Sequence, residues 1–445
     1  MDPINQGQPT KEKPIKEELQ SNVTYIDGKV YDLRKFKHPG GDAAINLAIG
    51  RDATSMFHSY HPFNDKHVKI LSKYKIRDEL LPSDYVSEVF GKQVDDASFG
   101  DIFDWPTTLQ SPFYTELRDE ARKVFKVTGT KANFKRWTQI LCALACVLFI
   151  LPFYVKGYWA AMFLFPLAYW VLGVNTFHDA SHFSLFKNQT LNHYFTHIFP
   201  AFASSHTWYH QHVIGHHQYT NTEEDPDMHH GTFLWRYTIA TKHRWYFRFQ
   251  IYYLFAVWSI VVFYVAFVQD IFLTIKGRYD QIRKAPQTRT QFFAQLAWRL
   301  FAAYTIYVWP FMMSEFSWFK AIAFATLPYT IFSYCFSFCS QINHITEMTV
   351  DNGQDKNWYK HQIKTSHTFC PDSDFWYIFT GGLNLQVEHH LFPGVNSIHL
   401  REIQPIVQAL CEKHRIQYIL SKTASEAFTK HINQLVKVSN LQPSE

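Results

Sequence analysis

The sequence predicts a small N-terminal α+β domain followed by an all-α membrane domain with about four transmembrane helices and a histidine-rich cytosolic cap. The chain of 445 residues is long enough for two or three domains. Aromatic residues make up 18% of it and charged residues only 18%, against a usual ~25% charged, which indicates contact with lipid. The net charge of +5 is too small to indicate nucleic acid binding. The 24 histidines are the most unusual feature, and their spacing decides the functional interpretation.

The N-terminal part has the pattern of a soluble domain. Residues 1–20 are polar and lack the apolar core of a signal peptide, so we expect a cytosolic N-terminus. Short apolar alternation, a Pro-Gly-Gly turn and helical spacing then follow one another up to about residue 80. We therefore place one domain at 20–90, a hydrated linker at 91–110 and the membrane domain at 111–445.

Long runs without charge mark the membrane-spanning segments. The first two form a hairpin and the other two come later in the chain: 137–155, 158–175, 300–314 and 321–340. A fifth run, 251–268, would place the histidine-rich segments before and after it on opposite sides of the membrane if it spanned. The basic stretch at 276–289 indicates the cytosolic side. We therefore predict that 251–268 lies in the membrane plane or re-enters, with five spans as the alternative.

Two histidines of the N-terminal domain have the setting of axial haem ligands. His38 begins a His-Pro-Gly-Gly turn, in which proline fixes the backbone and glycine lets a porphyrin edge approach. His61 follows 23 residues later in the segment GRDATSMFHSYH. The tetrapeptide alone could be a surface turn, but with this segment it resembles a cytochrome b5 domain. That resemblance implies haem b held by His38 and His61, with His58 as a weaker candidate for the second ligand that we expect on the surface. Two histidine ligands leave no open iron position, so such a haem transfers electrons.

Three further histidine clusters lie just beyond the predicted spans. They are HDASH at 178–182, HVIGHH at 212–217 and QVEHH at 386–390, and His344 lies one turn past the last span. Histidines four residues apart share one helix face and can reach one ion, whereas adjacent histidines point apart and suit two neighbouring metals. Imidazoles bind zinc, copper, iron or nickel. We expect Asp179 and Glu388 to accept hydrogen bonds from the second ring nitrogens. The alternative is that each cluster is an interfacial histidine pair.

Together with the N-terminal domain, these boxes resemble the front-end fatty acyl desaturases, in which histidines hold a di-iron centre. The resemblance covers about 20–430 and implies an α+β cytochrome b5-like domain followed by an all-α membrane desaturase domain. Gln386 stands where the wider family has another ligand, so it is a possible ninth. The three-residue spacing from His212 to His216 is similar to the Δ5 members. The implied metal ligands are His178, His182, His212, His216, His217, His344, His389 and His390.

The resemblance also implies an activity and its partners. The enzyme would insert a cis double bond between the carboxyl end and an existing double bond of a long-chain polyunsaturated acyl substrate. It would use O2, two non-haem iron ions, and electrons from NADH delivered by a separate NADH-cytochrome b5 reductase. It would lie in the endoplasmic reticulum membrane as a multi-pass protein with both termini cytosolic. The alternatives are a Δ6 or sphingolipid long-chain-base desaturase, a fatty acyl hydroxylase of the same di-iron class and, remotely, a haem-bearing zinc transporter.

Overall fold

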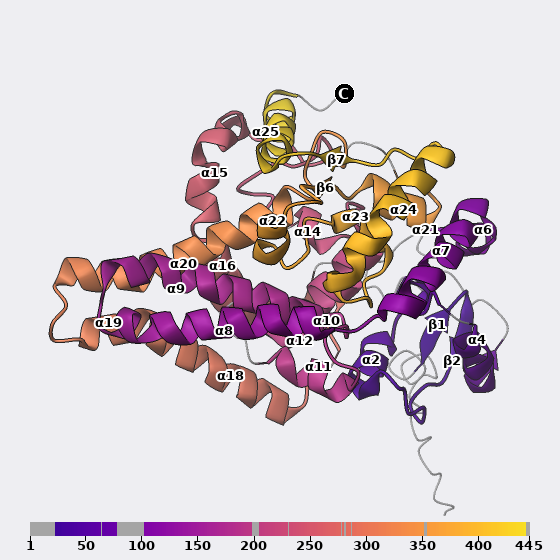
Figure 1. Cartoon of the computed structure of the whole chain (residues 1–445), viewed down its shortest axis with the longest axis horizontal. Helices are drawn as coiled ribbons and strands as arrows, with labels where there is room; N and C mark the ends of the chain where they lie inside the picture. Colours follow the sequence, from indigo (N-terminus) through magenta and orange to yellow (C-terminus); the bar gives the residue numbers. More distant parts are fainter. Residues whose placement is uncertain are drawn as a thin grey trace, which may run out of the picture.

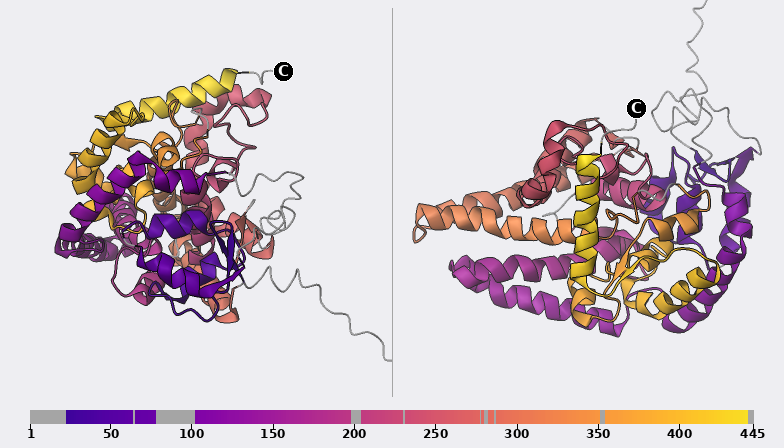
Figure 2. Two further views of the ribbon diagram at one scale, coloured as in Figure 1. Left: turned by 90° about the vertical axis from the view of Figure 1, so that its right-hand side faces the viewer. Right: turned by 90° about the horizontal axis from the view of Figure 1, so that it is seen from above.

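A computed structural model describes residues 23–63, 65–77, 102–197, 204–229, 231–276, 278–279, 282–285, 287–350 and 354–441. In Figure 1 the N-terminal domain lies at one end of the molecule, beside the helix at 112–128 and the short helices between residues 179 and 216. Long helices extend from the other end, and we call them the arm. The right-hand view of Figure 2 shows them projecting beyond the rest of the structure. Residues 1–22, and residues 64 and 78–90 of the domain predicted at 20–90, lie outside the described residues.

The N-terminal domain is the α+β unit that the sequence predicts. Strand β2 pairs antiparallel with both β1 and β3, and Tyr25 lies opposite Val30. Buried Ile26, Tyr31 and Leu33 pack with residues of the helices in a small core. The elements are β1 (Thr24–Ile26), β2 (Lys29–Tyr31), α2 (Gly41–Ala48), α3 (Thr54–Tyr60), α4 (Lys66–Leu71), η1 (Ser72–Tyr74) and β3 (Lys75–Arg77).

The second half of the predicted linker is ordered rather than hydrated. Its residues 91–101 lie outside the described residues, but helix α6 (Trp105–Gln110) follows, capped by Asp104, and leads into α7 (Pro112–Thr128). Trp105 is only 5% exposed because its ring stacks on His58 of the N-terminal domain and on Trp358. The segment therefore contributes to the contact between the two domains.

The arm consists of helices with apolar outer surfaces. Asn133 and Ser317 cap two of them, and the lipid-type surface of α8 leaves Leu148 58% and Phe149 71% exposed. Helices α8 and α20 both pack on α9. The arm contains α8 (Phe134–Val155), α9 (Trp159–Gly173), η3 (Val174–His178), α10 (Asp179–Ser181), α18 (Arg289–Ala303), η7 (Tyr304–Val308), α19 (Trp309–Met312) and α20 (Trp318–Gln341).

Among the residues that the structure describes, three helices are long and apolar enough to cross a membrane, namely 134–155, 159–181 and 318–341. The predicted span at 300–314 instead lies on the continuous helix α18–η7–α19, which does not reach that apolarity. This helix carries Arg299, whose guanidinium pairs with buried Asp270. Four spans are reached only if a bent helix pair around residue 260 counts as one.

That bent pair contains the fifth uncharged run. The segments 245–258 and 261–276 meet at 66°, the geometry of a broken span or a re-entrant loop. The Ser333 hydroxyl from α20 donates to the Trp258 carbonyl oxygen (2.5 Å) and accepts from the Val262 N–H (3.1 Å), which satisfies backbone groups freed by the break. The prediction for 251–268 is thus compatible with this bend.

The bent pair consists of η5 (Trp245–Phe249), α15 (Gln250–Trp258), α16 (Val261–Phe263), η6 (Tyr264–Gln269) and α17 (Asp270–Lys276). The remaining helices and short strands form the cap around the histidine boxes. They are α11 (Gln189–Phe195), α12 (Ser205–Trp208), η4 (Tyr209–His216), α13 (His217–Tyr219), α14 (Pro226–His229), β4 (Arg278–Tyr279), β5 (Ile282–Arg283), α21 (Trp358–Lys364), β6 (Thr368–Phe369), α22 (Asp374–Phe379), α23 (Gln386–Leu391), η8 (Ser397–His399), α24 (Leu400–Lys413), β7 (Leu420–Ser421) and α25 (Ala424–Asn440). Strands β6 and β7 pair in parallel and tie α25 to the cap.

Candidate metal centre

All eight histidines predicted as metal ligands lie in one buried cluster at the cap end of the arm. Seven of them form two groups whose ring nitrogens converge within 4.8 Å. The first group contains His178, His182, His212 and His389, and the second contains His216, His344 and His390. His217 belongs to neither group, but its Nε2 atom lies 3.2 Å from Nε2 of His212 and its ring stacks on His390 at 4.2 Å.

Adjacent histidines serve different groups, as their spacing predicts. His389 joins the first group and His390 the second, and both lie on α23. The expectation for His212 and His216 is wrong, because these two do not share a group. Their segment, η4, is a π-helix, whose backbone hydrogen bonds run to the fifth rather than the fourth residue and so widen each turn. In this widened turn Nε2 of His212 lies 3.2 Å from Nε2 of His217.

Hydrogen bonds fix the tautomers of the second group. Nδ1 of His216 donates to the Asp225 carboxylate (3.0 Å), Nδ1 of His344 to the Thr365 carbonyl oxygen (3.0 Å) and Nδ1 of His390 to Oε1 of Gln362 (2.8 Å). Each Nε2 atom is then left with a lone pair, yet Nε2 of His216 lies 3.2 Å from Nε2 of His344. Two facing lone pairs repel unless a cation lies between them, so this geometry fits a metal ion.

The first group has the same character. Nε2 atoms of His178 and His212 face each other at 3.2 Å. Nε2 atoms of His182 and His389 are buried and have no hydrogen-bond partner within the described parts of the chain. Buried polar atoms are normally paired, so convergent unpaired imidazole nitrogens also fit a metal ion.

Burial keeps most of these imidazoles neutral, the form that binds a metal. It lowers the pKa of His182, His212, His344 and His389, and the neighbouring imidazoles lower it further. His216 differs: burial lowers its pKa, but the Asp225 carboxylate more than compensates and raises it overall. A carboxylate that stabilises positive charge on His216 also stabilises a cation bound to it.

The two acidic residues predicted to support the histidines do something else. The Asp179 carboxylate accepts from the guanidinium of buried Arg136 (2.7 Å) and from Ser397 and Asn396, so it anchors the first box to α8. Glu388 accepts from the Tyr418 hydroxyl (2.7 Å) and from Thr368. Burial raises the pKa of Glu388 to about 7. In the sequence the only nearby partners of these carboxylates are histidines, because Arg136 and Tyr418 lie far from them along the chain.

Apart from Asp225, which follows the second box closely, the residues that hydrogen-bond to these histidines lie far from the boxes in sequence. Besides Asp225, Gln362 and the Thr365 carbonyl, the Tyr60 hydroxyl lies 2.9 Å from Nδ1 of His182. The amide nitrogen of Gln386 lies 2.8 Å from Nε2 of His344, which places this predicted possible ligand at the edge of the second group. Of these residues, only Asp225 could have been suspected from the sequence, because it lies in an Asp-Pro-Asp motif shortly after the second box.

The haem-ligand candidates face each other in the N-terminal domain. The ring centroids of His38 and His61 are 5.8 Å apart, and Nδ1 of His61 donates to the Phe57 carbonyl oxygen (2.7 Å), which leaves its Nε2 lone pair available. Burial lowers the pKa of both, that of His38 to about 4. The spacing of the two rings fits axial ligation from two sides, although Nδ1 of His38 accepts from the Gly40 N–H (2.8 Å), so Nε2 of His38 would have to lose its proton to bind iron. His58 is not a surface residue as expected: it is buried, and its Nε2 lies 2.8 Å from Asp27.

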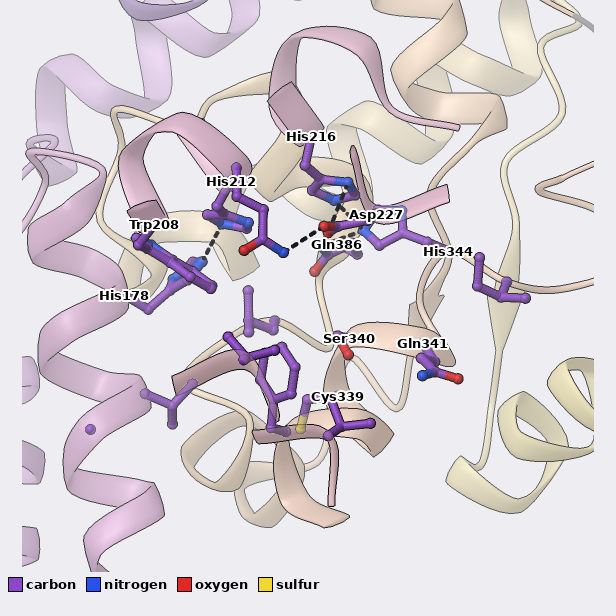
Figure 3. A pocket seen from close by; sticks show the side chains of 18 of the residues that line it. His178, Trp208, His212, His216, Asp227, Cys339, Ser340, Gln341, His344 and Gln386 are labelled. Atoms are coloured by element: carbon purple, nitrogen blue, oxygen red, sulfur yellow. Dashed lines mark hydrogen bonds and ion pairs between the residues drawn. The ribbon is translucent and has the colours of Figure 1, made fainter. Parts of the chain in front are cut away.

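An apolar pocket opens onto both histidine groups (Figure 3). Its wall includes His178 and His212 of the first group and His216 and His344 of the second. Away from the histidines it is lined by side chains of α9 and α20 such as Tyr169, Trp170, Phe332 and Cys339. The pocket therefore leads from the arm to the ring nitrogens.

Comparison with known proteins gives this site a family. The family model for fatty acid desaturase matches residues 156–422, and the model for the cytochrome b5-like haem/steroid binding domain matches residues 14–79. An acyl-lipid (8-3)-desaturase of Physcomitrium patens is 30% identical, with 93% of this chain and 87% of that protein covered. The Delta(5) fatty acid desaturase A of Dictyostelium discoideum is 28% identical, covering 93% and 90%. An acyl-lipid omega-13 desaturase of Chlamydomonas reinhardtii is also 28% identical, covering 92% of each chain. No solved structure matches the chain.

These matches define a membrane oxidoreductase that carries its own cytochrome b5-like domain. The chain belongs to the fatty acid desaturase family. The family implies a di-iron centre and O2, and the N-terminal domain implies haem.

Proposed function

We propose that this protein is a front-end acyl desaturase that inserts a cis double bond at Δ5 of 20-carbon polyunsaturated chains. The observation that carries the proposal is the apolar pocket whose wall contains histidines of both groups. An acyl chain lying along α9 and α20 would bring its methylene groups to the ring nitrogens. A polar substrate would find no hydrogen-bond partners along the apolar side chains of this wall. The three-residue spacing between His212 and His216 and the name of the Dictyostelium relative support Δ5.

The eight histidines are proposed to hold two iron ions, with Gln386 as a possible further ligand. When bound, the iron ions supply the redox chemistry that reduces O2 to two water molecules with two electrons, two protons and the two hydrogens lost from adjacent methylenes. The protein holds the ligands in place for this. Trp208 stacks on His212 at 4.3 Å and donates to the Ser181 hydroxyl (3.0 Å), which links the first and second boxes. Arg136 fixes Asp179 between two ligands.

The pocket walls exclude water from the reacting methylenes. Trp170 donates to the Phe379 carbonyl oxygen (2.9 Å) and packs edge-on against Phe332 at 5.5 Å, so the wall between α9, α20 and α22 is rigid. A dry, fixed wall keeps the acyl chain in one register and limits side reactions with solvent. This is the part of the site that would set the double-bond position.

Electrons are proposed to reach the centre through the N-terminal domain. His38 and His61 would hold the haem, with NADH as the source and a separate NADH-cytochrome b5 reductase as the donor. The domains are proposed to span 20–90 and 111–445. The haem domain and the C-terminal helices lie at the same end of the arm as the histidine cluster. We therefore propose that both termini are cytosolic and that the arm lies in the endoplasmic reticulum membrane.

Feeding a yeast that lacks polyunsaturated lipids tests the proposal. The strain expresses the chain and receives a 20-carbon Δ8,11,14 acid or an 18-carbon Δ9,12 acid, and gas chromatography with mass spectrometry locates new double bonds. We expect a new Δ5 bond on the 20-carbon chain, lost in His178→Ala and kept in His243→Ala, a histidine outside the cluster. A Δ6 bond on the 18-carbon acid would replace the Δ5 assignment, and a hydroxylated product would indicate the hydroxylase alternative.

A further inference from the structure

One hydrogen bond joins the haem domain directly to the histidine cluster. Tyr60 is the last residue of α3, and its hydroxyl lies 2.9 Å from Nδ1 of His182, 122 residues away. With Nε2 of His182 turned toward the first group, the proton sits on Nδ1 and is donated to the phenol oxygen. The other outer partners of the cluster described above, Asp225, Gln362 and Thr365, all come from the desaturase domain.

The desaturase domain holds the loop after Tyr60 from several sides. Nε of Arg122 donates to the Phe63 carbonyl oxygen (2.8 Å), and the Phe63 ring packs against Phe125 and Phe392 with centroids 5.3 and 6.1 Å apart. A Cβ atom on Gly394 would lie 3.2 Å from Cδ1 of Tyr60, so the backbone at Gly394 closely approaches the tyrosine ring. The position of the hydroxyl is therefore set by docking of the whole domain.

Tyr60 also precedes His61 in the chain. One peptide bond and one tyrosine side chain thus connect the candidate haem ligand to a histidine of the first group. Hydrogen bonds to a ligand's second ring nitrogen fix its orientation and tautomer, and changing such partners typically costs about 10- to 100-fold in metal affinity or activity. A partner that arrives with another domain makes this orientation depend on that domain.

We propose that Tyr60 is a positioning residue that couples the two redox centres, orienting His182 when the haem domain is docked and completing the electron path from His61 to the first group. This inference rests on the proposed function, since it requires haem at His38 and His61 and iron at the histidine cluster. In the coupled step one electron leaves the ferrous haem, which becomes ferric, and is accepted by the iron centre.

Haem reoxidation in the full-length protein tests the coupling without measuring product. Purified protein containing haem and iron is reduced stoichiometrically without oxygen, mixed with O2 and acyl substrate, and followed by haem absorbance. His178→Ala gives the rate of direct oxidation by O2. We expect Tyr60→Phe to slow the His178-dependent reoxidation about 10-fold, while the ferric haem spectrum stays unchanged. Tyr74→Phe is the matched control, because its ring packs on Phe36 within the haem domain.

A second variant approaches the same bond from the other domain. Gly394→Ala pushes the Tyr60 ring without removing its hydroxyl, and we expect slower reoxidation here too. Loss of non-haem iron from Tyr60→Phe with a native haem spectrum would equally support the positioning role. Wild-type rates and iron content in both variants would overturn the inference while leaving the proposed function intact. A wild-type protein that holds no non-haem iron would overturn both.

Discussion

The two histidine groups both consist of imidazoles, but different kinds of contact hold those imidazoles in place. In the second group, Nδ1 atoms of the three histidines donate to oxygen atoms of the desaturase domain itself, one of them the Asp225 carboxylate. In the first group, His212 is held by the stacked ring of Trp208 and His182 by a phenol from the haem domain. The second group is therefore organised by its own domain and by charge, whereas the first depends on packing and on docking. Perturbing the haem domain should affect the first group.

Removing one ligand from either group should have the largest effect. His178→Ala and His344→Ala each remove one imidazole from a buried group. We expect double-bond formation to fall below detection in both. If the groups fill independently, non-haem iron should fall from about two ions per chain to about one.

Metal analysis and product analysis on the same preparations check this. The matched control is His243→Ala, whose imidazole contacts the Ser439 carbonyl oxygen far from the cluster. Full activity in His344→Ala would show that the second group is not required. Loss of both ions in either variant would show that the groups bind metal cooperatively rather than separately.

Removing charge from the second group should have the next largest effect. Asp225→Asn keeps the shape but removes the carboxylate that stabilises a cation at His216, so we expect iron affinity to fall about 10- to 100-fold. Asp227→Asn is the matched comparison, since this carboxylate lies farther from Nδ1 of His216, at 3.6 Å rather than 3.0 Å. Competition with a chelator measures both, and an equal loss in the two variants would contradict the assigned role of Asp225.

The sequence indicates which histidines cluster much better than it indicates what supports them. Local periodicity predicts the α+β domain and the apolar helices, and the short histidine motifs with the family resemblance imply the His38–His61 pair and the eight clustered histidines. Tyr60 and Gln362 could not be found this way, since they reach the histidines from segments more than a hundred and about thirty residues away in the chain. Asp179 was misassigned because its partner Arg136 lies on another helix. The π-helical winding of 209–216 was likewise not visible, so His212 and His216 were paired wrongly.

A smaller effect is expected at the edge of the second group. Gln386→Ala removes one neutral amide, whose nitrogen lies 2.8 Å from Nε2 of His344 and whose oxygen accepts from Asn343 (3.3 Å). An Nε2 lone pair that binds iron cannot also accept from this amide, and a neutral hydrogen bond contributes about 0.5–1.5 kcal/mol, so losing the amide should tighten iron binding by about 10-fold at most. Chelator competition measures it, and a loss as large as that of Asp225→Asn would indicate that Gln386 is itself a ligand.

The smallest expected effect concerns packing in the first group. Trp208→Phe keeps an aromatic ring over His212 but removes the indole N–H that donates to Ser181. Losing one hydrogen bond costs about 1 kcal/mol, or about fivefold in first-group iron affinity if all of it appears there. Measured in the His344→Ala background, chelator competition reports mainly on the first group, and Trp245→Phe on the exposed surface is the control. An unchanged affinity would mean that the indole hydrogen bond to Ser181 does not contribute to iron binding in the first group.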